Sequence, residues 1–446
     1  MRGRPRPLRT PRPNPALLPL DKLINQIPFD KLINMRTALN NPFSPGSDIV
    51  PEVWAGRTEQ LSDWQNVVRP RRLAGLPERG RTILGEPGLG KSSLVRRIAQ
   101  DAEARGDWVT PQLRIPSGTD PLKSVANALL DLAAQAGLPS SREKRIADLL
   151  NRVEEVAVSG VSLTLRQKPG PEPYSVLKDL LIEVGRAASK RQKLVLVHID
   201  EVQNITNEDA LSQLLVALGD ALTYEEEVTI PGGQIKALLP LAVYLTGLPD
   251  FENKAGALKG ATFARRFKTS TLTPLSNGDI EFALQPFVRG EWEVPSADGS
   301  TLPIRMEQDA VAAIIDLCLG DPFLFQLAGE RAWYAGTGDV ITREEVLRGW
   351  RTARSEASAH VERILARLPQ LEREFLEGMA TLPPSERTLT AIAAALGREK
   401  STELGPTAQR LDIVRGIVER NKRGKPYVFR HRAVEALLTS DWPIVE

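Results

Sequence analysis

The sequence contains little of what would support a disulfide scaffold or a metal centre. It has one cysteine, Cys318, so no disulfide can form within the chain, which predicts a reducing compartment, the cytoplasm. Cys318 lies in an apolar helical pattern and is interpreted as a small buried residue. The three histidines, His198, His360 and His431, have no metal-ligand spacing, which argues against a metal site built of side chains alone.

Long apolar runs and a strong net charge are also absent. The longest apolar stretches, such as residues 238–245, fall short of the ~20 residues that a membrane span needs, and the basic N-terminus lacks the apolar segment of a secretion signal. We therefore expect no membrane partner. The formal net charge is only +2, so any binding to nucleic acid must come from local patches.

The composition is that of a globular protein, and the 446 residues suggest two or three domains. Residues 1–40 begin with interleaved arginine and proline, and we expect a disordered basic extension without an assigned function. Residues 41–273 alternate short β-rich runs with amphipathic helices. This order is typical of an α/β fold with a parallel sheet and helices on both faces.

The periodicity locates individual elements of this α/β region. We expect strands at Thr82–Leu84, Trp108–Ile115, Leu194–Ile199 and Leu241–Thr246. We expect helices at Lys91–Ala104, Pro121–Ala136, Tyr174–Ala188 and Asn207–Leu222. Residues 153–165 alternate apolar and polar side chains, which predicts a further short β segment.

A glycine-rich phosphate-binding motif follows the first of these strands and opens the first helix. It matches G-x-x-x-x-G-K-[ST] in full. The residues are Gly85, Glu86, Pro87, Gly88, Leu89, Gly90, Lys91 and Ser92, with Ser93 next in the chain. Backbone N–H groups of such a loop surround phosphates, Lys91 is expected to reach the β- and γ-phosphates, and the Ser92 hydroxyl is expected to ligate Mg²⁺. The pattern predicts binding of ATP or ADP with Mg²⁺.

Two carboxylates, Asp200 and Glu201, follow a fully apolar strand about a hundred residues later. A buried parallel strand delivers them to the sheet edge at which α/β proteins bind ligands. Asp200 is expected to hold the Mg²⁺ water shell and Glu201 to polarise the attacking water. Taken alone, two acids after a strand could equally cap a helix. Beside the phosphate loop they predict ATP hydrolysis, slow or stimulated by a partner.

Two further positions are candidates for catalysis. Thr246, at the end of its strand, could orient the same water or touch the γ-phosphate, or it could be a strand-end turn residue. Arg265 and Arg266 follow in the chain. One of them could reach a phosphate in a neighbouring subunit, and we favour Arg266 for this role. A solvated helix face is the alternative for this pair.

With these residues in place, the chain resembles the AAA+ superfamily over residues 41–446. The resemblance is to the branch containing origin-recognition-type ATPases and the STAND switch ATPases. The segment before the phosphate loop is similar to the start of a bacterial group of AAA ATPases with a C-terminal winged helix. In that group a Gly-Arg pair before an acidic residue, here Gly56, Arg57 and Glu59, lies beside the nucleotide. On the residues alone, Gly56 and Arg57 could be an ordinary helix entry.

The region expected to form the lid, residues 274–367, has apolar residues at helical spacing and predicts a small helical bundle. Origin-recognition-type proteins carry an arginine after a Gly-Asp pair, whereas here Gly320 and Asp321 are followed by Pro322. This departure puts ATP-dependent ring assembly in doubt. The sequence Gly320-Asp321-Pro322 is similar to the STAND lid motif, in which the proline region senses nucleotide. A helix break is equally compatible with these residues.

Residues 368–446 predict three helices and then two short strands, Ile417–Arg420 and Tyr427–Arg430, which is the order of a winged helix. Residues 401–430 could contact double-stranded DNA, with the helix after Gly405 in the major groove and a basic turn on phosphates. That turn contains Lys422, Arg423 and Lys425. A winged helix used for packing or autoinhibition is the alternative.

Two functions remain open at this point. One is a DNA-associated ATP switch, and the other is a signalling switch in which the winged helix clamps the chain or meets a protein partner or second copy. A small-molecule kinase is disfavoured because Glu201 suits water activation and over 170 residues follow the α/β region.

Overall fold

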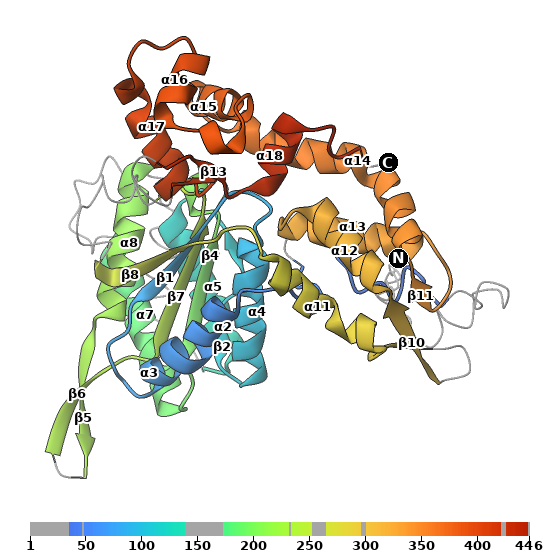
Figure 1. Cartoon of the computed structure of the whole chain (residues 1–446). Helices are drawn as coiled ribbons and strands as arrows, with labels where there is room; N and C mark the ends of the chain where they lie inside the picture. Colours follow the sequence, from blue (N-terminus) through green and yellow to red (C-terminus); the bar gives the residue numbers. More distant parts are fainter. Residues whose placement is uncertain are drawn as a thin grey trace, which may run out of the picture.

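The fold comes from a computed structural model that describes residues 35–46, 49–138, 173–231, 233–251, 265–295, 300–420 and 425–444. An α/β sheet domain is followed by a lid and a C-terminal module (Figure 1). Residues 1–34 of the expected N-terminal extension and the expected β segment at 153–165 lie outside these ranges. No helix in the described ranges is long and apolar enough to cross a membrane.

The central sheet is parallel throughout, as the alternation of strands and helices predicts. Its strand order is β2-β4-β7-β1-β8, and β3 also pairs with β4. The strands are β1 Gly80–Leu84, β2 Trp108–Val109, β3 Leu113–Arg114, β4 Val195–Asp200, β7 Leu241–Gly247 and β8 Phe267–Thr271. The single strand expected at 108–115 is therefore two short ones. Because all strands run in one direction, their carboxyl ends share one edge.

Helices cover both faces of this sheet, which confirms the expected fold class. On one face pack η2 Trp64–Val68 and α4 Lys91–Ala104, on the other α5 Pro121–Gln135, α7 Pro173–Lys190 and α8 Glu208–Leu222. Successive residues of β4 alternate between the faces: Val195 and Val197 belong to the core under α5, α7 and α8, and Leu196 to the core under α4. Both sides of the strand are buried, so its sequence is apolar at nearly every position.

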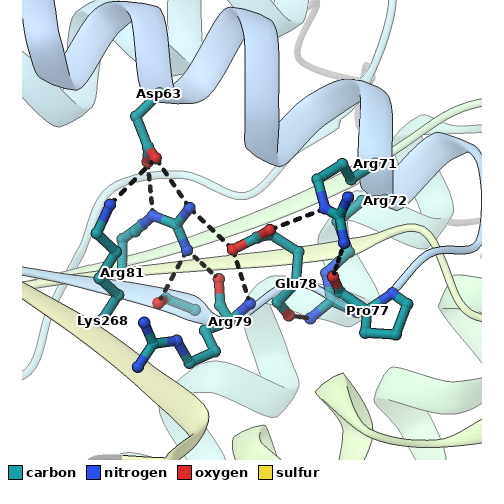
Figure 2. Close-up of polar contacts among 9 residues, drawn as sticks. Asp63, Arg71, Arg72, Pro77, Glu78, Arg79, Arg81 and Lys268 are labelled. Atoms are coloured by element: carbon teal, nitrogen blue, oxygen red, sulfur yellow. Dashed lines mark hydrogen bonds and ion pairs between the residues drawn. The ribbon is translucent and has the colours of Figure 1, made fainter.

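Ion pairs fix the end of β1 that lies away from the phosphate loop (Figure 2). The buried Arg81 contacts Asp63 of α2 (Thr58–Asp63) at 2.6 Å and Glu78 at 3.0 Å. Asp63 also contacts Lys268 of β8 at 3.5 Å, and Glu78 contacts Arg71 of α3 (Arg69–Leu73) at 3.0 Å. The strand that leads into the phosphate loop is thus held by charges as well as by packing.

A hairpin that the sequence did not indicate projects from the sheet domain (Figure 1). It consists of β5 Glu225–Ile230 and β6 Gly233–Leu238, paired antiparallel. Both faces are largely exposed, so its residues lack the apolar alternation of a half-buried strand.

The lid contains the expected helices and also a small sheet. The helices are α11 Asn277–Arg289, α12 Gln308–Cys318, α13 Pro322–Tyr334 and α14 Arg343–Ala366. Between them β9 Trp292–Pro295, β10 Thr301–Met306 and β11 Val340–Ile341 form a three-stranded sheet, so the purely helical bundle was an incomplete prediction. The strands are short, and β9 and β10 contain prolines, which obscured their period. Residues 35–40, expected to belong to a disordered extension, pack on this lid instead, where the buried Arg36 contacts Glu345 at 2.7 Å.

The C-terminal module follows the order that the sequence predicts, three helices and then a hairpin. It comprises α15 Gln370–Ala380, α16 Leu389–Ala395, α17 Gly405–Gln409, which continues as η6 Arg410–Val414, then β12 Val418–Glu419, β13 Val428–Phe429 and α18 Arg432–Thr439. One apolar core runs through the lid and this module. Trp442 packs on Trp350 of α14, with ring centroids 6.2 Å apart.

Candidate functional site

The phosphate-loop residues connect β1 to α4 at the carboxyl edge of the sheet. Gly88 and Gly90 have φ angles of 85° and 78°, which favour glycine, and Gly90 caps the start of α4. A Cβ at Gly88 would collide with the ring of His360 on the lid helix α14. The loop is therefore shaped by its own glycines and by close approach of the lid.

Lys91 lies at the start of α4 with its amine against the loop. Its Nζ donates to the carbonyl oxygens of Gly85 at 2.8 Å and Glu86 at 2.9 Å. Burial lowers the pKa of Lys91 to about 8, although the charges of Glu86, Asp200 and Glu201 oppose that shift. A buried amine surrounded by backbone dipoles gains from an anionic ligand that restores its charge.

Asp200, at the end of β4, is the centre of the polar contacts at this edge. Its Oδ1 accepts a hydrogen bond from the Ser92 hydroxyl at 3.1 Å and another from the Thr246 hydroxyl at the end of β7. Its Oδ2 accepts from Gln112 at 2.9 Å and from Arg114 at 3.1 Å. The structure thus brings together three predicted residues from three elements. Sequence reasoning missed Gln112 and Arg114, although the parallel pairing of Arg114 with Asp200 is what strands ending at one edge should give.

Glu201 follows Asp200 in a left-handed conformation, φ 55° and ψ 45°, which is uncommon for a residue with a side chain. Its backbone N–H donates to the Thr246 hydroxyl at 3.2 Å, and its carboxylate accepts from Asn204 at 3.0 Å. Glu201 is exposed to the cavity, whereas Thr246 is buried and holds the two acids in place.

The residues around Asp200 suit a hard cation such as Mg²⁺. The hydroxyl oxygen of Ser92 and a carboxylate oxygen of Asp200 lie 3.1 Å apart. The described residues contain no group of three or more His, Cys, Asp or Glu that could hold a metal ion without a further ligand. Mg²⁺ characteristically binds one or two protein oxygens together with substrate phosphates and water. Ser92 and Asp200 would hold the ion, which would neutralise phosphate charge there.

A cavity of about 600 Å³ lies between the sheet domain and the lid. It is lined by the loop residues Pro87 to Ser93, by Arg57 and Glu201, and by Pro322 at the start of α13. Arg57 donates to the carbonyl oxygens of Leu89 at 2.9 Å and Thr273 at 2.8 Å, and burial lowers its pKa to about 10. Gly56 packs against Leu275, where a Cβ would not fit.

Asp321 connects the lid to the C-terminal module directly beside the cavity. It is fully buried, caps α13 by accepting from the Leu324 N–H, and contacts His360 at 3.0 Å and His431 at 3.7 Å. Its contacts with these histidines hold the pKa of Asp321 below its usual range despite its burial. Phe323 stacks on His360, with ring centroids 4.4 Å apart.

Two predicted residues lie away from the cavity. Glu86 points from the phosphate loop toward the C-terminal module and contacts Arg415 there at 3.5 Å. Arg266 precedes β8, at the end of the sheet opposite the phosphate loop, and pairs with Asp220 of α8 at 2.6 Å. Arg266 therefore lies outside the cavity of its own chain.

A phosphate loop between a parallel strand and a helix, facing a carboxylate at the end of the next strand but one in the sheet, defines the class of P-loop nucleotide-binding proteins. Within that class, residues 53–230 match the model of the AAA ATPase domain family. The chain is 27% identical over 117 residues to the ORC1-type DNA replication protein 2 of Archaeoglobus fulgidus. The aligned part is 26% of this chain, and it spans only 30% of the length of that relative.

The overall fold is similar to that of the Aeropyrum pernix ORC2 protein in its ADPNP and ADP complexes, with a TM-score of 0.52 and 14% identity. The match covers 88% of this chain and 96% of that one. At this identity the likeness concerns the fold alone. The expected resemblance to origin-recognition-type AAA+ ATPases and the expected P-loop AAA+ fold are both confirmed.

Proposed function

We propose that this chain is an ATP-hydrolysing molecular switch that binds Mg-ATP in the cavity between the sheet domain and the lid. The observation that carries the proposal is the hydrogen bond of 3.1 Å between the Ser92 hydroxyl and Asp200, beside the buried amine of Lys91. This is the arrangement that a phosphate loop and a magnesium-binding carboxylate need in order to share one ligand. Turnover is slow or stimulated by a partner.

The individual roles follow from the contacts. Lys91 binds the β- and γ-phosphates, Ser92 and Asp200 hold Mg²⁺, and Glu201, which is exposed to the cavity, activates water. The hydroxyl of Thr246 positions the Asp200 carboxylate and the backbone of Glu201. Arg57 and Pro322 line the nucleotide from the sheet domain and the lid. Arg266 would act only on a neighbouring copy.

The Lys91→Ala variant tests nucleotide binding. Without the amine, titration with a fluorescent ATP analogue should give no saturable binding, because a charged contact to the phosphates is lost. Lys123→Ala, which removes an exposed lysine of α5, is the matched control and should bind like the unchanged protein. Equal binding by Lys91→Ala would overturn the proposed site.

We further propose that the C-terminal module is a winged helix that contacts double-stranded DNA. The order of its elements and the printed name of the Archaeoglobus relative, a DNA replication protein, support this. The triple change Lys422→Glu, Arg423→Glu and Lys425→Glu should weaken binding to a duplex at low salt, because it replaces cations that would face phosphates. Of these positions, only Lys425 lies in the described ranges.

A second candidate is a signalling switch that does not bind DNA. The observation that favours it is the position of η6, the continuation of the helix expected to enter the major groove. Its Arg410 contacts Asp250 at 2.8 Å, and Arg415, just after η6, contacts Asp250 at 3.0 Å. Light scattering with ADP or a non-hydrolysable ATP analogue, each with and without duplex DNA, separates the two. A change of size that needs nucleotide but not DNA would favour this candidate.

A further inference from the structure

The hairpin formed by β5 and β6 is not used by the nucleotide site. It projects from the sheet domain at the end away from the C-terminal module (Figure 1), and none of its residues lines the cavity. Its base is held by the Leu238 N–H, which donates to the carbonyl oxygen of Gly75 at 2.9 Å. A two-stranded hairpin is at best marginally stable in water, and further strands that extend an apolar face stabilise it.

One face of this hairpin carries exposed apolar side chains. Val228 and Ile235 lie directly opposite each other in the register, so they share a face, and they are 40% and 46% exposed. Ala237 lies on the same face two positions further along β6. Leu76, which follows Gly75 at the base of the hairpin, is also exposed. A strand added beside the hairpin would extend this apolar face and cover part of it.

The two strands of the hairpin differ in charge. Three consecutive glutamates, residues 225–227, lie on β5. The only charged residue of β6 is Lys236, whose amine lies 3.5 Å from the Glu225 carboxylate. Two β5 edges side by side would bring glutamates of both copies together, whereas two β6 edges would not. The free edge of β6 therefore suits a second copy of the same chain.

The backbone of β6 selects one register for such a contact. The Leu238 N–H points away from β5, toward Gly75, and the direction of the amides alternates along a strand. The N–H and C=O groups of Gln234 and Lys236 therefore also point outward, and among the described residues they have no backbone partner. With a twofold axis at Ile235, Gln234 of each copy faces Lys236 of the other, which gives four hydrogen bonds. A shift by one residue on each strand would instead place two Lys236 side chains opposite each other.

We propose that two copies of this chain associate through the edges of β6. The two hairpins form one four-stranded antiparallel sheet, with Val228 and Ile235 of both copies on a single apolar face. The contact is isologous, so it closes with two copies and does not propagate. Six-residue strands bury less area than a standard protein interface, so the affinity is in the micromolar range. Because the hairpin is separate from the cavity, association needs no nucleotide, and the proposal does not rest on the proposed function.

Disulfide cross-linking of the full chain tests the register. Ile235→Cys places two thiols at the twofold axis, where the facing Cα atoms would lie about 4.5 Å apart, within the reach of a disulfide. Mild oxidation should give a covalent dimer on a non-reducing gel. Val228→Cys is the matched control on the same face, one strand further from the axis, with roughly 14 Å between the copies, and it should remain monomeric. Cys318, the cysteine already in the chain, is buried. Equal cross-linking of the two variants, or none of either, would overturn the proposal.

Sedimentation velocity over a range of protein concentrations, without nucleotide, tests the edge. Gln234→Pro removes an outward N–H of β6 and should raise the dissociation constant at least about tenfold. Thr229→Pro makes the same change at the directly opposite residue, on the outer edge of β5, and should leave the association unchanged. Thermal unfolding identifies a variant that fails to fold, in which case Ile235→Lys, which sets like charges face to face, replaces Gln234→Pro. A protein that is monomeric at every concentration, or a dimer that Gln234→Pro leaves intact, would show that β6 is not the interface.

Discussion

Glu86 of the phosphate loop and Arg415 of the C-terminal module form a buried ion pair at 3.5 Å, although 329 positions separate them in the chain. Arg415 also contacts Glu372 of α15 at 2.7 Å and Asp250 beyond β7 at 3.0 Å. Burial raises the pKa of Glu86, and the charge of Arg415 opposes that rise. We call these four residues the ionic joint. It connects the C-terminal module to two loops at the carboxyl edge of the sheet.

Removing the cation of the ionic joint should be strongly destabilising. Arg415→Ala takes from the buried Glu86 its ion-pair partner and leaves the buried Glu372 with Arg410 alone, and the expected loss is about 3 kcal/mol in the free energy of unfolding. Denaturant unfolding of nucleotide-free protein measures it. In a double-mutant cycle with Glu86→Gln, the two losses should add to more than the loss in the double variant. Strict additivity would mean that the pair is not coupled.

Replacing the proposed water-activating carboxylate should separate binding from turnover. Glu201→Gln keeps the size and the hydrogen-bonding capacity of the side chain but cannot accept a proton, so phosphate release should fall at least about a hundredfold. Affinity for ATP should stay within about threefold of the unchanged protein, since Lys91 and Ser92 are intact. Normal hydrolysis by this variant would show that another group activates the water.

Thr246 should matter for turnover more than for binding. Its hydroxyl joins Asp200 to the backbone of Glu201, so Thr246→Val should lower phosphate release about tenfold by loosening both acids. The matched control is Thr82→Val on the adjacent strand β1, where the buried hydroxyl has no hydrogen-bond partner in the part of the chain that the structure describes. That change should be neutral or slightly stabilising. Equal effects of the two variants on turnover would contradict a positioning role for Thr246.

His198 should make the protein sensitive to acid. Burial in β4 lowers the pKa of His198 to about 4, against 6.5 in the unfolded chain. Between these values the unfolded chain binds more protons than the folded one, so stability falls as the pH is lowered from 6.5 to 4, by about 3 kcal/mol for this group.

His198→Met should remove that part of the pH dependence, as measured by urea unfolding at several pH values. Burial also lowers the pKa of His431, so a loss of the same sign should remain in the variant. An unchanged pH profile would assign the acid sensitivity to other groups.

The parts of the site that the sequence predicted are those with a local signature. The phosphate loop is continuous in the chain, and helix α4 begins and ends where the periodicity placed it, at Lys91 and Ala104. Asp200 could be placed beside the loop because an apolar strand of that length must be buried in a parallel sheet, and parallel strands end at one edge. These arguments need only the chain direction and the period of the elements.

The missed parts depend on contacts between distant segments. Nothing near Glu86 in the chain indicates Arg415, and nothing in the pattern of α14 shows that Arg363 and Arg367 face a cavity while Arg351 does not. The sheet of the lid was missed because Pro295 and Pro303 interrupt strands that are only four and six residues long. Exposed polar side chains do not recur at a spacing that marks them in the sequence. Only the folded structure shows which of them belong to a site.

The lid and the C-terminal module share one apolar core and therefore form a single structural unit. The Trp442 indole donates a hydrogen bond to the carbonyl oxygen of Leu317 in α12. The Trp350 indole of α14 donates one to the carbonyl oxygen of Pro443, so residues 442–443 are held against two lid helices. Any rotation of the lid would therefore carry the C-terminal module with it. Because Arg415 of that module pairs with Glu86 and Asp250 of the sheet domain, such a rotation would separate the charges of the ionic joint.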